Sequence, residues 1–383
     1  MSFSSDVVVI DIGSRSICAY AAGRLSDDAF SIDSYCETEY DGYTEGRWNR
    51  TDLVLPTIFK LLDKTERTIG AIKTVYVGIP ADFCVVRSIY DKISFPKPKR
   101  VTRLDLEEIY EANDPFAGSD SETIAVSPIL FLDDKGDRLS DPVGHATTFL
   151  KTRVSFIGTQ KSILDPIRDG IIDRGVKKVR FIPSEYAAAR ELFTKEEREG
   201  GILLADIGYT ATAILHMAGD ALLEMRTFAL GGSMIPTGLA TRFDIPFRVA
   251  SAFVPKINLG YKDEGDYTMK YDASTYVCPV GEVNALTKEC IDCIALYLRR
   301  SLESFKYEVP SGATLYVTGG GLCEIRLARE YLAKVLGRRV EFVQPMTLNF
   351  AKPYFSTAVG LIGEAIRMQK QERFGFLRKL FNI

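Results

Sequence analysis

The chain has 383 residues, of which 46% are hydrophobic and 26% charged, and it carries a net charge of −3. This length exceeds one ordinary core, and the composition is that of a globular protein rather than a disordered one. Nucleic-acid binding is excluded because the basic clusters, such as residues 97–100, are short. No apolar run reaches the ~18 residues that span a bilayer, and the cysteines are scattered. We therefore expect a chain in a reducing compartment with at most peripheral membrane contact.

The first lobe is predicted from residues 1–83 and 161–199, where strands and helices alternate. It opens with a buried strand at 7–10, a tight turn and a second strand. Between its two parts, residues 84–160 combine short strands, polar turns and one helix. This segment predicts a small inserted α+β module with few contacts to the second lobe.

The second lobe is predicted to begin after a charged hinge at 194–201. Its core comprises residues 200–232 and 313–368, and residues 233–312 form an outer subdomain. An apolar strand, an Asp-Ile-Gly turn and a second strand recur at its start, so the chain contains a weak internal duplication. Two related lobes facing each other would form a cleft.

Three loops carry the predicted chemistry of this cleft. Asp11-Ile12-Gly13-Ser14 and Asp206-Ile207-Gly208 each follow a buried strand, and Thr318-Gly319-Gly320-Gly321 precedes a helix. Tight turns with glycine let backbone N–H groups approach a phosphate, and the two aspartates would hold Mg²⁺ through water. A single Asp-x-Gly is also common in plain β-turns, so the prediction depends on the repetition and on the third loop.

The three loops in this order resemble those of the actin, Hsp70 and sugar-kinase superfamily. Residues 228–232, residues 354–361 and the position of the inserted module resemble the FtsA family of bacterial cell division. The resemblance implies an α/β, actin-like, two-lobed fold with a duplicated ribonuclease-H-like core, the small α+β subdomain and an amphipathic C-terminal helix. It implies that ATP is contacted by Asp11, Gly13, Ser14, Arg15, Ser16, Asp206, Gly208, Tyr209, Thr210, Gly231, Gly232, Ser251, Gly319, Gly320 and Gly321.

Several positions depart from the family pattern. Tyr209 and Thr210 stand where the second loop usually has glycines, and Ser16 stands where the first loop usually has a lysine. Ser251 and Val254 replace a glutamate and a lysine that face the ribose and adenine in relatives. These substitutions predict weak or degenerate binding of ATP with Mg²⁺, and at most a weak ATPase.

Glu185 is the one catalytic candidate, as a group that could orient a water. The alternative is a solvated charge at a helix start, where the helix dipole favours an acidic side chain.

The last residues form a separate pattern. At about 100° per residue, the apolar side chains from Phe374 onward fall on one half of a helical wheel, and the charged half is basic. Residues 369–383 are therefore predicted to be a polar spacer, Gln369 to Glu372, and a membrane-binding helix. The alternative is a helix docked on the protein's own core. The predicted membrane-binding residues are Arg373, Phe374, Phe376, Leu377, Arg378, Lys379, Leu380, Phe381 and Ile383.

The FtsA resemblance implies a membrane-tethered adaptor on the cytoplasmic face of the cell membrane at the septum. Its expected partners are the FtsZ C-terminal peptide, other copies of itself in filaments, anionic lipids and other division proteins. A second possibility is a pilus-assembly homologue of the PilM kind, because residues 185–190 resemble the crossover helix of that family. A third is a small-molecule kinase of the same superfamily, which would have no use for a membrane tail.

Overall fold

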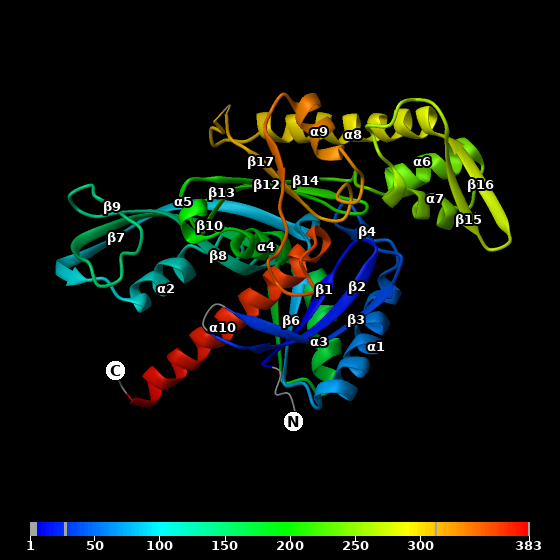
Figure 1. Cartoon of the computed structure of the whole chain (residues 1–383). Coiled ribbons are helices and arrows are strands. Elements are labelled where there is room, and N and C mark those ends of the chain that lie inside the picture. Colours follow the sequence, from blue (N-terminus) through cyan, green and yellow to red (C-terminus); the bar gives the residue numbers. More distant parts are fainter. Residues whose placement is uncertain (1–5, 27–28, 311, 382–383) are drawn as a thin grey trace.

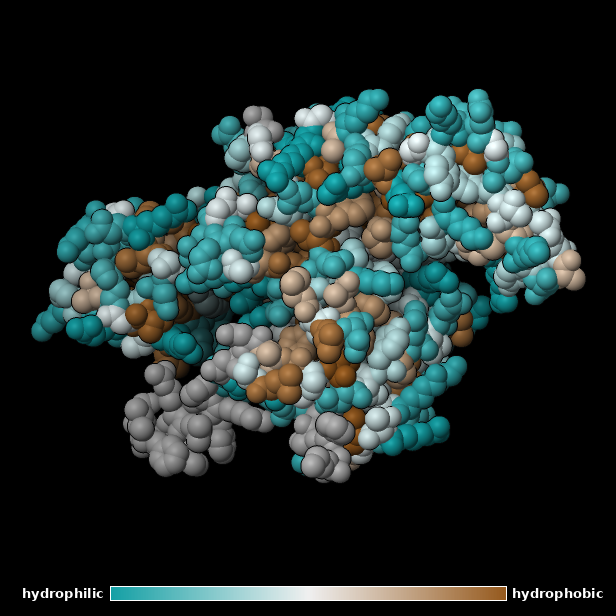
Figure 2. Space-filling model, in the orientation of Figure 1, coloured by the Kyte–Doolittle hydropathy of each residue, from teal (hydrophilic) through white to brown (hydrophobic). Residues whose placement is uncertain are grey.

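The computed structural model describes residues 6–26, 29–310 and 312–381, with side chains through Glu372 in the last segment. Two lobes, each built on a five-stranded sheet, face one another, and two smaller units project from them as arms (Figure 1, Figure 2). Hydrophilic side chains predominate on the face of both arms that Figure 2 shows. None of the described helices is long and apolar enough to cross a membrane.

The first lobe is built on a sheet with the strand order β11-β6-β1-β2-β3. Every residue of β1 is buried because helices cover both faces of the sheet. Helices α1 and α3 pack on one face, and α4 and α10 pack on the other. The elements are β1 (Val7–Ile12), β2 (Ser16–Arg24), β3 (Phe30–Glu39), the hairpin β4 (Tyr43–Thr44) and β5 (Arg47–Trp48), α1 (Thr51–Ile69), β6 (Thr74–Ile79), η1 (Ala81–Phe83), α3 (Lys161–Asp173), β11 (Lys178–Pro183), α4 (Ser184–Leu192) and α10 (Ser356–Phe381).

The second lobe is built on a sheet with the strand order β14-β13-β12-β17-β18. Helices α6 to α9 pack on one face, and α4 of the first lobe packs on the other. The hairpin of β15 and β16 extends the outer arm, at the right of Figure 1. The elements are β12 (Ile202–Ile207), β13 (Thr212–Ala218), β14 (Ala221–Phe228), α6 (Met234–Phe243), α7 (Phe247–Phe253), η2 (Val254–Lys256), β15 (Asp266–Tyr271), β16 (Ser274–Pro279), α8 (Val280–Glu303), β17 (Leu315–Thr318), α9 (Ala328–Leu336), β18 (Val340–Phe342) and η3 (Pro353–Phe355).

The two sheets repeat one topology. In the first, β1 pairs antiparallel with β2 and parallel with β6, and β2 continues into β3. In the second, β12 pairs antiparallel with β13 and parallel with β17, and β13 continues into β14. The fifth residue is Asp11 in β1 and Asp206 in β12. The predicted duplication is therefore confirmed.

The inserted module is an α+β unit with one helix, as predicted, but three of its four strands have 12 to 17 residues and are not short. Its strand order is β7-β10-β8-β9, and α2 begins with a capping box between Thr102 and Asp105. The elements are β7 (Cys84–Arg100), α2 (Arg103–Ala112), β8 (Ser121–Leu132), β9 (Arg138–Leu139) and β10 (Ala146–Gln160).

The prediction that this module makes few contacts with the second lobe is wrong. Ile157 of β10 shares a buried cluster with Leu204 and Leu222 of the second lobe. The N–H of Leu222 donates a hydrogen bond of 3.0 Å to Ser127 Oγ of β8. The ends of β8 and β10 present apolar residues toward the second sheet, and burying them joins the module to both lobes.

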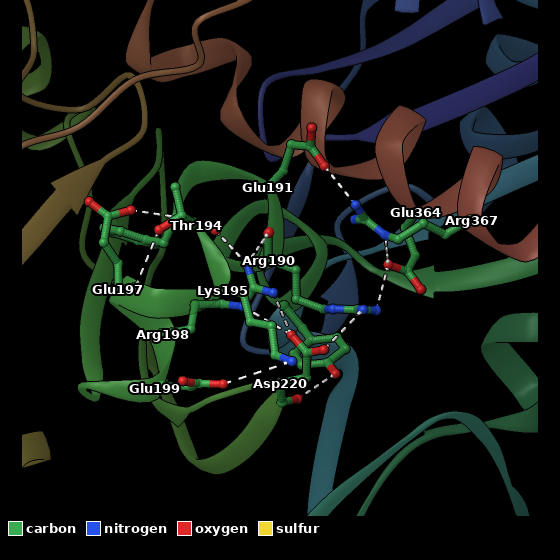
Figure 3. Close-up of polar contacts among 12 residues, drawn as sticks. Arg190, Glu191, Thr194, Lys195, Glu197, Arg198, Glu199, Asp220, Glu364 and Arg367 are labelled. Carbon is green, nitrogen blue, oxygen red and sulfur yellow. Dashed lines mark hydrogen bonds and ion pairs between the residues drawn. The ribbon is translucent and has the colours of Figure 1, made fainter. Parts of the chain in front are cut away.

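A network of charged side chains links α4, α10 and the turn between β13 and β14 (Figure 3). Arg190 of α4 pairs with Glu364 of α10 at 2.7 Å and with Asp220, in the β13–β14 turn, at 3.5 Å. Arg367 of α10 pairs with Glu364 and with Glu191 of α4, each at 2.9 Å. Helices α4 and α10 are thus held together by charge as well as by apolar contact.

The predicted hinge contains a short helix, α5 (Lys195–Glu199). Thr194 caps it and accepts the N–H of Glu197, so the charged residues favour a capped turn rather than a free connection. Arg198 pairs with Asp220 at 2.7 Å and is mostly buried. The connection between the lobes is therefore fixed to the second lobe.

The predicted spacer before the tail is not separate from the preceding helix. α10 runs without a break through Gln369 and Glu372, because no glycine or proline interrupts these positions. Glu372 pairs with Lys178 at 2.5 Å and with Arg180 at 3.3 Å, which docks this part of α10 on the first lobe. The side chains of the membrane residues from Arg373 onward lie outside those that the structure describes.

Candidate functional site

Asp11 and Asp206 face one cavity between the lobes, as the sequence predicts. They lie near the ends of the equivalent strands β1 and β12, so the same local topology places each carboxylate at the cleft. The cavity has a volume of about 400 Å³, within the range of small-molecule sites. A shared cleft between duplicated lobes is therefore present.

Asp11 is buried and Asp206 is half-buried, and neither forms an ion pair with a lysine, arginine or histidine whose side chain the structure describes. Burial raises the pKa of Asp11 to about 6, although Thr357 Oγ1 donates a hydrogen bond of 2.9 Å to its Oδ2. Burial, and second the charge of Asp11, raises the pKa of Asp206 to about 7. Within the described part of the chain no three acidic, histidine or cysteine side chains converge as metal ligands. A cation held by this pair would need water or a ligand to complete its coordination.

Glu185 is half-buried at the cavity wall rather than freely exposed at the helix start. Its Oε2 accepts the N–H of Ala81 at 2.8 Å. Burial, and next the charge of Asp206, raises its pKa well above the usual range. Burial also raises the pKa of Asp82, which lines the same wall. This direction favours the protonated form of Glu185, which weakens it as a general base.

The two loops that the sequence predicts to bind phosphate touch each other directly. The N–H of Thr210 donates a hydrogen bond of 3.1 Å to Ser14 Oγ across the cleft. The Arg15 guanidinium lies 5.4 Å from the ring centroid of Tyr209 and pairs with Glu39 at 2.9 Å. ATP phosphates need free backbone N–H groups and a cation at this place. In this conformation the Ser14–Thr210 contact and the Arg15–Tyr209 contact occupy part of the space between the two loops.

The glycine-rich loops pack against each other rather than against open space. A Cβ at Gly319, whose φ is +88°, would lie 2.2 Å from Asp206 Oδ1. A Cβ at Gly232 would lie 2.4 Å from the Cα of Gly321, and one at Gly231 would lie 2.6 Å from the carbonyl oxygen of Gly208. Glycine is required here because three loops meet backbone to backbone.

The structure brings most of the predicted site residues to the cavity. Lining it are Asp11, Gly13, Ser14, Arg15, Ser16, Glu185, Asp206, Gly208, Tyr209, Gly319 and Gly320. Five predicted residues are not in its lining. Those are Thr210, Gly231, Gly232, Ser251 and Gly321. The three glycines instead allow close loop packing, and Ser251 is half-buried on α7.

Sequence reasoning missed several residues of the cavity wall. They include Tyr35, Glu37, Tyr43, Asp82, Glu324, Tyr354 and Thr357. Thr357 lies in the segment 354–361 that carried part of the family resemblance, so a search of that segment for polar side chains would have found it. Nothing in the sequence marks Tyr35 and Glu37 of β3 as cavity residues, because they stand in the alternating pattern of an ordinary edge strand.

Substituting Asp206 with asparagine is expected to stabilise the protein at pH 8. A buried carboxyl with a raised pKa favours folding while protonated, and this contribution is lost as pH rises from about 4, its value in an unfolded chain, through the folded value. The melting temperature of the variant should exceed that of the parent at pH 8 and approach it near pH 4. Asp220 is the matched control: its pKa is lowered because Arg190 and Arg198 outweigh its burial. Asp220→Asn should lower the melting temperature at pH 8, and a gain there would contradict the assignment.

Comparison with known proteins agrees with this geometry. FtsA of Bacillus subtilis is 22% identical over 369 residues, covering 94% of this chain and 83% of its own length. FtsA of Escherichia coli K12 is 22% identical over 384 residues, covering 93% and 89%. The chain is a divergent relative of FtsA. No family model matches it.

Solved structures show that the fold of this FtsA relative is actin-like. A PilM–PilN type IV pilus biogenesis complex matches 95% of this chain and 98% of the other with a TM-score of 0.63 and 16% identity. MreB5 of Spiroplasma citri bound to AMPPNP matches 97% and 99% with a TM-score of 0.55 and 12% identity. Both likenesses confirm the predicted fold class.

Proposed function

We propose that this protein is a membrane-tethered, actin-like adaptor of cell division that recruits FtsZ filaments through the FtsZ C-terminal peptide. The observation that carries the proposal is that curated FtsA proteins match nearly the whole chain, with the inserted module included. The adaptor works by binding rather than by turnover. Its self-association into filaments and its contacts with other division proteins are part of the same proposal.

Nucleotide binding by the cleft is proposed to be weak. The Ser14–Thr210 contact and the Arg15–Tyr209 stacking close the space between the loops without a phosphate. Closing the lobes is what a bound triphosphate achieves when its phosphates bridge two such loops. Here side chains contribute that closure, and any Mg²⁺ would be held through water by Asp11 and Asp206.

Replacing Tyr209 with glycine is expected to tighten the binding of Mg-ATP. The change removes the ring beneath Arg15 and frees both the guanidinium and the loop N–H groups for phosphate oxygens. Isothermal titration calorimetry should show at least a tenfold lower Kd. Tyr209→Phe keeps the ring and should bind as the parent does. Equal or weaker binding by the glycine variant would show that Tyr209 is not the obstacle.

The tail is proposed to bind anionic lipid on the cytoplasmic face of the membrane. α10 is docked on the first lobe as far as Glu372, and its backbone continues as a helix to Phe381. The sequence of this extension is amphipathic with a basic polar face, as in helices that lie in a membrane interface. A rigid extension would set the distance between lipid and lobes.

A pilus-assembly role is the second candidate, because the fold of this chain matches that of the PilM–PilN complex with a TM-score of 0.63. A pull-down separates the two roles. The full chain should retain an FtsZ C-terminal peptide and should not retain a PilN peptide. The opposite result would replace the division role with the pilus role.

A further inference from the structure

The sheet of the inserted module has two faces. Helix α2 covers one face, and the second lobe covers only part of the other. Under α2, Val101, Phe131 and Leu150 form a small core. The opposite face packs on the second lobe near the start of β7 and the end of β10. Further along these strands it carries Tyr90, Lys92, Phe149, Lys151 and Arg153, which we name the outer face.

Two cations of the outer face, Lys92 and Lys151, lie side by side. Lys92 and Lys151 are direct partners in the antiparallel pairing of β7 and β10, a position where like charges repel. Their Nζ atoms lie 4.7 Å and 5.9 Å from the ring centroid of Phe149. Among the residues that the structure describes, none forms an ion pair with Lys92, Lys151 or Arg153.

Arg153 is fixed between two aromatic rings. Its guanidinium lies 4.7 Å from the ring centroid of Tyr90 and 4.4 Å from that of Tyr307, which belongs to the second lobe. Nη1 donates a hydrogen bond of 3.0 Å to Tyr90 Oη, while the buried Nε has no partner within the described residues. Tyr90 itself is 70% exposed. The face therefore combines a preorganised guanidinium, two ammonium groups and exposed aromatic surface.

The orientation of the module separates this face from the lipid-binding end of the chain. In Figure 1, α2 lies on the side of the module toward which α10 descends. The outer face is on the opposite side of the sheet from α2 and is thus turned away from the end of α10. A membrane bound by the tail would not meet it.

We propose that the outer face binds an acidic, extended segment of a partner protein. A carboxylate between Lys92 and Lys151 would relieve their repulsion, and a second could form a bidentate pair with Arg153. Aromatic side chains of the segment could stack on Tyr90 and Phe149. Three cations match a short acidic segment, whereas a nucleic-acid strand requires a basic groove along several nucleotides. The inference is independent of the nucleotide cleft.

Binding of a labelled glutamate–tyrosine copolymer to the full chain, measured by fluorescence anisotropy, tests the proposal. The double variant Lys92→Glu, Lys151→Glu should raise the Kd at least tenfold. The control Lys73→Glu, Lys177→Glu makes the same charge change at two exposed lysines of the first lobe and should change the Kd less than twofold. Lys92→Glu alone should weaken binding and keep or raise the melting temperature, because it replaces a repulsive pair with an attractive one.

Three outcomes would overturn the proposal. The double variant could bind the copolymer as tightly as the parent, or the control could lose as much affinity as the double variant. Polythymidylate or phosphatidylglycerol vesicles could displace the copolymer at equal charge concentration, which would identify a nucleic acid or lipid surface instead. A lysine–tyrosine copolymer should not bind to the outer face.

Discussion

Gly360→Ala is expected to destabilise the fold by about 2–3 kcal/mol, the cost of overpacking a tight interior. A Cβ at Gly360 would lie 2.4 Å from the backbone nitrogen of Ala188 and 2.5 Å from its Cα. α10 thus approaches the backbone of α4, and no side chain can move aside. The helix propensity of alanine offsets at most ~1 kcal/mol of this cost. Denaturant unfolding should show a lower midpoint with an unchanged slope.

Gly363 offers a matched control on the same helix. A Cβ there would lie 2.2 Å from Glu191 Oε2, the end of a flexible side chain. Gly363→Ala should displace Glu191 from its ion pair with Arg367 and change the free energy of unfolding by less than about 1 kcal/mol, in line with a partly exposed pair. Equal losses in the two variants would contradict the assignment of the Gly360 cost to backbone contact between α10 and α4.

Much of the fold can be predicted from the sequence, because buried strands appear there as continuous apolar runs. β1 and β12 are apolar runs followed by an Asp-Ile-Gly turn, so the start of each lobe can be predicted from the sequence. The contact of the module with the second lobe could not be predicted, because Ile157 and Leu222 are far apart in the chain and each looks like an ordinary strand residue.

The same limit applies to the site. Residues at or next to turns, such as Asp11 near the end of β1 and Gly319 after β17, could be predicted because turn chemistry is local. The direct contact between Ser14 and Thr210 could not be predicted, since it depends on how closely the two lobes approach each other. The predicted spacer failed for a related reason: polar residues from Gln369 to Glu372 look like a linker, but Glu372 is placed by charges on β11.

The triple variant Phe374→Glu, Leu377→Glu, Phe381→Glu is expected to abolish binding to anionic vesicles. Each large apolar side chain contributes roughly 1.5–3 kcal/mol when fully buried, and the basic residues add about 1 kcal/mol each near an anionic surface. The variant removes half of the apolar face and adds three negative charges. Co-sedimentation with phosphatidylglycerol vesicles should fall more than a hundredfold.

The melting temperature of this triple variant should be nearly unchanged. The described contacts of α10 with the first lobe extend to Glu372, before the substituted positions. The control Val85→Glu, Leu104→Glu, Val143→Glu makes the same change at exposed apolar residues of the module and should leave vesicle binding intact. A large loss of melting temperature in the tail variant would mean that the tail packs on the core.

Recruitment of FtsZ filaments to phosphatidylglycerol vesicles by the full chain tests the adaptor role most directly. The account predicts that FtsZ sediments with the vesicles when the full chain is present, and remains in the supernatant with the tail variant or when the FtsZ C-terminal peptide is deleted. If the full chain sediments with the vesicles while FtsZ stays in the supernatant, the adaptor role is contradicted.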